Sequence, residues 1–130
     1  MNSKAKWFSL SLLAVALPAS ATFHLMKIVE VFPGTAVAPN AQYVVIQMYA
    51  SGQEFVAGHA ITVFDRSGAL VGTITFPADD PNGASQDRIL IATTQAQTFF
   101  GIAADLVMSP ALLSAGGKVC WAGTLDCVSW

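Results

Sequence analysis

Short runs rich in β-branched and aromatic residues, each bounded by turn-forming residues, recur along most of this chain. Such runs are typical of β-strands, and their close spacing disfavours the alternating helices of a βαβ layout. One short helix is expected over residues 95–100, with Thr94 as its N-cap and Gly101 closing it. The sequence therefore predicts an all-β, antiparallel β-sandwich with one short helix. The expected strands are residues 23–32, 42–49, 60–65, 69–76, 88–92, 105–108, 118–121 and 126–130.

The last two expected strands carry the two cysteines of the chain, Cys120 and Cys127. Residues 122–125 between them read as a turn, so the pair is expected to form a disulfide across a hairpin. Redox-active pairs usually have a Cys-x-x-Cys spacing, and zinc would need two further ligands near by. A structural disulfide is therefore the prediction, and a redox pair or metal thiolates are the alternatives.

The amino terminus has the pattern of a cleavable signal peptide over residues 1–21. Lys4 and Lys6 precede an apolar run over residues 7–17, and Pro18 and the small residues 19–21 follow it. The run is about half as long as the roughly twenty residues that cross a bilayer as a helix, so no retained membrane anchor is expected. The sequence predicts export to a secreted or periplasmic location, where an oxidising environment favours the disulfide. The mature domain is expected to span residues 22–130.

The charge of the mature domain argues against nucleic acid as a partner. Without Lys4 and Lys6, the six basic residues of the chain fall to four, against eight acidic ones. Nucleic-acid binding depends on clustered Lys and Arg that displace counterions from phosphates, and the four that remain are scattered. An exported domain that does not bind nucleic acid is the expectation.

Several of the expected strands together resemble the lamin tail domain, in particular its bacterial exported members. The resemblance rests on residues 23–31, 42–47 and 58–76, and it continues through residues 89–92, 116–119 and 126–130. It implies an immunoglobulin-like β-sandwich over residues 22–130 that serves as an accessory or binding module. The family supplies no catalytic residues. The chain has Val45 where the second strand of the family often carries an acid.

The loop over residues 79–87 is the most suggestive stretch for metal chemistry. It contains several side chains with hard oxygen donors, the kind that calcium prefers. The same residue types are common in exposed turns because they suit the backbone angles of turns, and the spacing is not that of an EF-hand. Calcium binding and a plain loop both remain open, and no cofactor is expected besides this possible calcium. The candidate ligands are Asp79, Asp80, Asn82 and Asp87.

Aromatic side chains are the other candidate binding groups. Tyr43, Tyr49, Trp121 and Trp130 could form a platform for a protein or a sugar, although a sandwich would bury most of them. The chain is 54% hydrophobic and 11% charged, which is apolar for a free domain and suggests a partner surface. Strand edges offer a second route to a partner, by addition of a strand to a sheet.

The leading hypothesis is an exported, non-catalytic interaction module that binds a protein or a cell-envelope component. No enzyme activity is expected. One alternative is a metal-dependent hydrolase, with calcium or another metal, that uses Asp79, Asp80, Asp87 and a histidine. A second alternative is a truncated remnant of a longer exported protein, since exported relatives tend to continue past a tryptophan such as Trp130.

Overall fold

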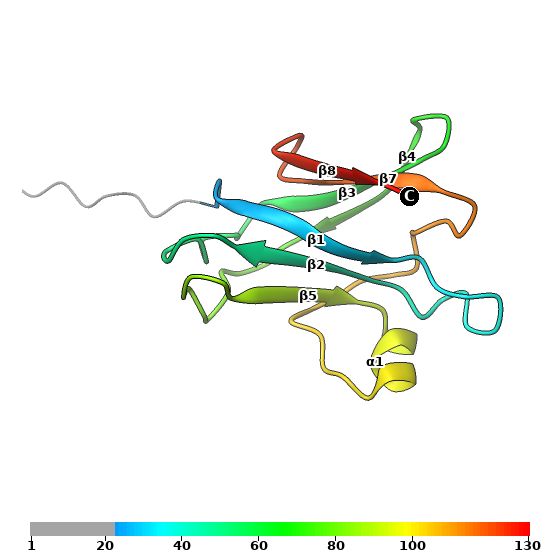
Figure 1. Cartoon of the computed structure of the whole chain (residues 1–130), viewed down its shortest axis with the longest axis horizontal. Helices are drawn as coiled ribbons and strands as arrows, with labels where there is room; N and C mark the ends of the chain where they lie inside the picture. The colour runs from blue at the N-terminus through cyan, green and yellow to red at the C-terminus, as the bar shows by residue number, and fades with distance from the viewer. Residues whose placement is uncertain (1–22) are drawn as a thin grey trace, which may run out of the picture.

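The computed structural model describes residues 23–130, so the predicted signal peptide over residues 1–21 lies outside the described residues. The described chain forms two four-stranded β-sheets packed face to face, with one short helix beside the first sheet (Figure 1). The predicted β-sandwich with one short helix is confirmed. The elements are β1 Met26–Phe32, β2 Tyr43–Met48, β3 Ala60–Asp65, β4 Leu70–Thr75, β5 Arg88–Ala92, α1 Thr94–Phe100, β6 Leu106–Val107, β7 Gly117–Trp121 and β8 Asp126–Ser129.

The strand order is β1-β2-β5-β6 in the first sheet and β4-β3-β7-β8 in the second. Neighbouring strands are antiparallel with one exception. Strands β5 and β6 are parallel, with Ile91 opposite Leu106. Parallel neighbours need a crossover connection, and here the segment that contains α1 supplies it. The structure therefore differs at this edge from the prediction of an antiparallel sandwich.

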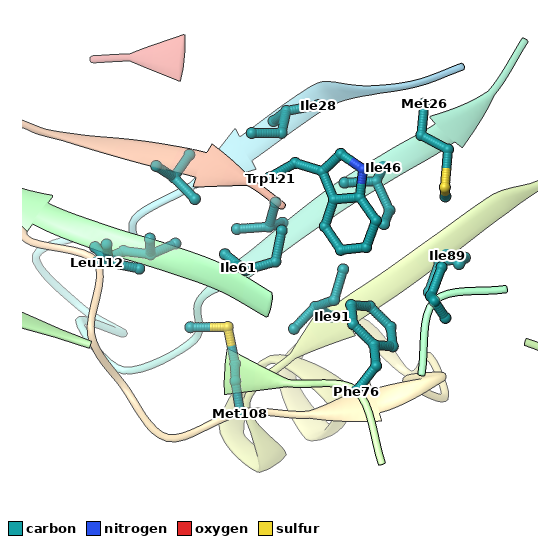
Figure 2. Packing of buried hydrophobic residues seen from close by; sticks show 14 of the residues in the cluster. Met26, Ile28, Ile46, Ile61, Phe76, Ile89, Ile91, Met108, Leu112 and Trp121 are labelled. Carbon is teal, nitrogen blue, oxygen red and sulfur yellow. The ribbon is translucent and has the colours of Figure 1, made fainter. Parts of the chain in front are cut away.

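The interior between the sheets is filled by alternate residues of the strands, as the two-residue period of a β-strand requires. Trp121 of β7 lies near its centre and has no exposed surface. Its register partner on β3 is Ile61, and the ring of Phe76 meets the indole edge-on at 5.6 Å (Figure 2). Because the two sheets share this core, the described chain forms one packed unit. The other fully buried large side chains are Met26, Ile46, Met48, Ile89, Ile91, Leu112, Val44, Val56, Val63 and Val119.

A disulfide joins Cys120 of β7 to Cys127 of β8, as predicted, with their Cα atoms 4.1 Å apart. Gly117 and Trp130 exchange backbone hydrogen bonds of 3.3 and 3.1 Å, which fixes the alternation of bonded pairs along this hairpin. Cys120 and Cys127 consequently form a non-hydrogen-bonded pair, the type in which side chains lie closest. Since Val119 and Trp121 point into the core, the disulfide lies on the outer face of the second sheet.

Candidate binding surface

Helix α1 lies against the outer face of the first sheet, and Thr93 fixes where it begins. The Thr93 hydroxyl accepts hydrogen bonds from the Ala96 amide at 3.0 Å and from the Gln42 amide at 3.1 Å, and it donates to the Asn40 carbonyl at 2.6 Å. Gly101 ends the helix in the left-handed conformation. The N-cap is therefore Thr93 rather than the predicted Thr94, and it ties the helix to the loop before β2.

Small side chains allow the helix to approach the sheet closely. Ala96 of α1 packs on Ala92 of β5 and on Ala41, and all three are buried. Larger residues at these positions would hold the helix away from the strands because close-packed interiors have little free space. This second, smaller cluster is separate from the core between the sheets.

Gln42 is a buried amide that fastens the loop before β2 to the segment before β7. Its side-chain nitrogen donates to the carbonyls of Pro39 and Leu112, each at 2.8 Å, and its side-chain oxygen accepts from the amides of Ala111 and Leu112, each at 2.9 Å. A buried amide is tolerated only when its donors and acceptors are paired, as they are here. The sequence pattern predicts only that Gln42 begins a strand, and it gives no sign of this buried role; strand β2 begins one residue later.

Four aromatic rings form a cluster where β1, β2 and α1 meet. The rings of Phe32 and Tyr43 stack with centroids 5.2 Å apart, and Phe100 lies edge-on to both, at 5.4 and 5.7 Å. Phe99 adjoins Phe100 at 5.0 Å. We call Phe32, Tyr43, Phe99 and Phe100 the aromatic cluster. Only Tyr43 among its members was a candidate from the sequence. The sequence does not show which residues pair across strands, so it could not place Phe32 beside Tyr43.

Glu30 of β1 holds the phenol at the edge of this cluster. The Tyr43 hydroxyl donates a hydrogen bond of 2.5 Å to Glu30 Oε1. Burial, together with the hydrogen bond and the negative charge of Glu30, raises the pKa of Tyr43 to about 12. The phenol is therefore neutral at physiological pH and serves as a hydrogen-bond donor, which orients the ring.

A hollow of about 450 Å³ lies between α1 and the loop before β2. We call it the helix-side hollow. Phe99 belongs both to its lining and to the aromatic cluster, and 56% of its surface is exposed. The volume is in the range of sites for small molecules or for single side chains of a partner. The lining residues are Ala38, Pro39, Asn40, Ala41, Thr94, Gln95, Thr98 and Phe99.

The remaining predicted aromatic candidates lie apart from this surface. Trp121 is in the core, where its indole N–H donates to the Phe23 carbonyl at 3.3 Å. Trp130 is half-buried, and its indole N–H donates to the Leu113 carbonyl at 2.8 Å. Tyr49 is exposed, with Lys27 Nζ 5.5 Å from its ring centroid. The structure does not bring the four predicted aromatic residues together.

Three of the four predicted calcium ligands, all but Asn82, accept hydrogen bonds from backbone amides, and the Asn82 amide is one of the donors. Asp79 accepts from Ala57 at 2.9 Å, Asp80 from Asn82 at 2.8 Å and Asp87 from Ala84 at 2.9 Å. Among residues 23–130, no group of three or more His, Cys, Asp or Glu side chains is arranged to hold a metal ion. The two alternatives for this loop, calcium binding and a plain exposed loop, both stay predictions.

Asp80 nevertheless lies in an acidic environment. Burial is the main cause that raises its pKa, and the negative charges of Asp105, Asp87 and Glu54 add to it, against the hydrogen bond from Asn82. Glu54 and Asp105 are far from the loop in sequence, so the sequence pattern did not identify them as its neighbours.

The groups that line the helix-side hollow are rings, methyl groups, hydroxyls and amides, which suit recognition by contact and hydrogen bonding. Across residues 23–130, no helix has the length and apolar character needed to cross a membrane. Comparisons with models of protein families, with curated proteins and with solved structures found no match to this chain.

Proposed function

We propose that this chain is an exported, non-catalytic interaction module that binds an apolar part of a protein or cell-envelope component at the helix-side hollow. The observation that carries the proposal is the position of Phe99, which is exposed where the hollow meets the aromatic cluster. Contiguous exposed apolar surface on a domain often marks an interaction site. Aromatic side chains at the centre of such a site commonly supply most of the binding energy.

The rigidity of the hollow supports the same proposal. Thr93 and Gln42 fix the loop before β2 by buried hydrogen bonds, and Thr93 also fixes the start of α1. Both walls of the hollow are thus held in place before a partner arrives. Binding to a surface that is already ordered costs less conformational entropy than binding that must order a loop.

The strand order supports the finer assignment of the fold as immunoglobulin-like. The order β1-β2-β5 corresponds to strands A, B and E of that fold, and β4-β3-β7-β8 corresponds to C′, C, F and G. Helix α1 and β6 are additions after strand E. Within this proposal the chain is a lamin-tail-like domain, as the resemblance of its strand sequences implies.

A titration with a defined probe tests the binding site. We expect N-acetyl-tryptophan amide, added to the ¹⁵N-labelled oxidised protein, to shift the amide signals of Ala41, Gln95 and Thr98 most. Phe99→Ala should weaken this binding about tenfold or more, the scale of a central aromatic contact. The measurement is a series of ¹⁵N–¹H correlation spectra.

Phe55 provides the matched control because it is also an exposed phenylalanine, at 44%, but lies outside the hollow and the aromatic cluster. Phe55→Ala should leave the titration unchanged. Shifts spread evenly over the surface, or equal effects of the two substitutions, would contradict the proposal.

A further inference from the structure

Three of the four outermost strands are protected against pairing with another chain. Strand β6 is only two residues long. Strand β1 carries the charged residues Lys27 and Glu30 on either side of an irregularity in its pairing at Val29. The Ile28 amide of β1 also donates a hydrogen bond to Asp126 Oδ2 of β8 at 2.7 Å. Strand β8 lies against β1 along this contact. Short length, charges, bulges and cover are the usual means by which proteins block a sheet edge.

Strand β4, the fourth outermost strand, lacks this protection over most of its length. Its sequence, Leu-Val-Gly-Thr-Ile-Thr, contains no charged residue and no proline. Its register shift against β3 falls at Val71, so residues 72–75 remain regularly paired. Strand β4 and residues 107–111 line a groove of about 370 Å³. The two described segments approach each other closely at Gly72 and Ala111, but no backbone hydrogen bond joins them.

The direction of the free backbone groups of β4 follows from the bonds at its end. The Phe76 amide donates to His59 and the Phe76 carbonyl accepts from Gly58, so both groups of Phe76 point towards the β3 side. Alternation along an antiparallel ladder then directs the groups of Ile74 towards β3 and those of Thr73 and Thr75 away from it. Thr73 and Thr75 therefore present unpaired N–H and C=O groups at the edge.

Apolar side chains flank these unpaired groups. Leu70 and Val71 on β4 and Val107 across the groove are all exposed, and Val71 has 43% of its surface exposed. A partner strand placed along β4 would cover apolar surface and pair backbone groups in one step. Both contributions favour association.

We infer that β4 pairs antiparallel with β4 of a second copy of this chain, about a two-fold axis through Thr73. The segment is self-complementary in this register, since Thr73 faces Thr73 of the other copy and Gly72 faces the larger Ile74. Val71 then lies opposite Thr75. Pairs of β-branched residues across strands are favourable, and no like charges are opposed. The two second sheets become one continuous eight-stranded sheet, and the symmetry closes at a dimer.

The test is the molar mass of the purified, oxidised protein over a range of concentrations, measured by sedimentation velocity. We expect the mass to rise towards twice the monomer mass between about 10 µM and 1 mM, the range of a weak single-strand contact. Val71→Lys places a charge at the paired edge and should weaken dimerisation about tenfold or more. Thr73→Lys, which brings two lysines together at the axis, should do the same.

Val29→Lys is the matched control. Val29 is also an exposed valine, at 39%, at an irregular position of an outermost strand, so the change in side chain and charge is the same. It should dimerise as the unmodified protein does. A monomer at every concentration, assemblies larger than a dimer, or equal behaviour of the Val71 and Val29 variants would overturn the inference. Cooperative unfolding of each variant checks that the fold is retained. If Val71→Lys does not unfold cooperatively, the molar mass of Thr73→Lys is compared with that of Val29→Lys instead.

Discussion

At the scale of single residues, the walls of the helix-side hollow depend on two buried polar side chains, Gln42 and Thr93. Each bonds to backbone groups of segments that are distant in sequence. Polar side chains in such positions are costly when their partners are removed, because the remaining donors and acceptors stay buried. Their loss should therefore affect both stability and the shape of the candidate site.

Two adjacent threonines allow a direct test of the helix cap. Thr93→Val removes one donor and two accepted hydrogen bonds at a buried position, so we expect a loss of about 2 kcal/mol in the free energy of unfolding. Thr94→Val changes an exposed side chain and should alter the stability by less than about 0.5 kcal/mol. Urea unfolding followed by circular dichroism measures both. Equal losses would show that Thr93 does not act as the cap.

Tyr43 should reveal its contact with Glu30 in an alkaline titration. In a Tyr49→Phe background, absorbance at 295 nm should report a Tyr43 pKa of about 12, and Glu30→Gln should lower it. Since the pKa is raised above its ordinary value of 10.0, the folded state holds this proton more tightly than the unfolded chain. The contribution to stability is thus complete below pH 10 and is lost as the pH rises towards 12. A midpoint near 10 in the presence of Glu30 would contradict the described contact.

At the scale of elements, the hairpin β7–β8 is fastened by its disulfide near the carboxyl end of the described chain. The bridged residues are seven positions apart, so the bond closes a short loop. The chain-entropy model gives a stabilisation of about 2 to 3 kcal/mol for such a loop.

We therefore expect a double substitution, Cys120→Ala with Cys127→Ala, to lower the free energy of unfolding by about 2 to 3 kcal/mol. The substituted chain should keep its fold, because Val119 and Trp121 of the same strand still pack in the core. Urea unfolding of the oxidised protein and of the double variant measures the difference. Unchanged stability would mean that the bond does not restrict the unfolded chain as the model assumes.

The elements differ in how far the sequence could predict them. Strands β3 and β5 have the expected bounds, because β-branched runs there end at turn residues. The parallel pairing of β6 was not predictable, since two residues carry no periodic signal and their partner depends on the path of the chain after α1. The choice between Thr93 and Thr94 as cap likewise depends on where α1 meets the loop before β2. Local pattern thus predicts strands, but contacts between segments decide edges and caps.

At the scale of the whole molecule, local sequence pattern predicted part of the candidate site, and contacts between distant segments decided the rest. The sequence predicted an apolar partner surface and named Tyr43, which lies in the aromatic cluster. It did not predict Phe32, Phe99 and Phe100, because strand register and the docking of α1 bring them together. Trp121 was a candidate by residue type alone. Its pairing with Ile61 follows from strand register within the second sheet, and its burial follows from the packing of the two sheets.

Calcium provides a test of the acidic loop in the intact domain. Since Asp79, Asp80 and Asp87 accept hydrogen bonds from nearby amides, we expect millimolar calcium to leave the melting temperature of the oxidised protein unchanged. A ligand that binds only the folded state would raise it. Differential scanning calorimetry with and without calcium measures this, and magnesium controls for a general effect of divalent ions. A rise specific to calcium, absent in Asp80→Asn, would establish a site in this loop.

The most direct test of the proposed function is photo-cross-linking from position 99 in living cells of the native organism. Benzoylphenylalanine replaces Phe99 in one variant and Phe55, an exposed residue outside the hollow, in the other. We predict a discrete cross-linked partner from position 99 and none from position 55. The absence of a product from position 99, or the same products from both positions, would contradict a binding site at the helix-side hollow.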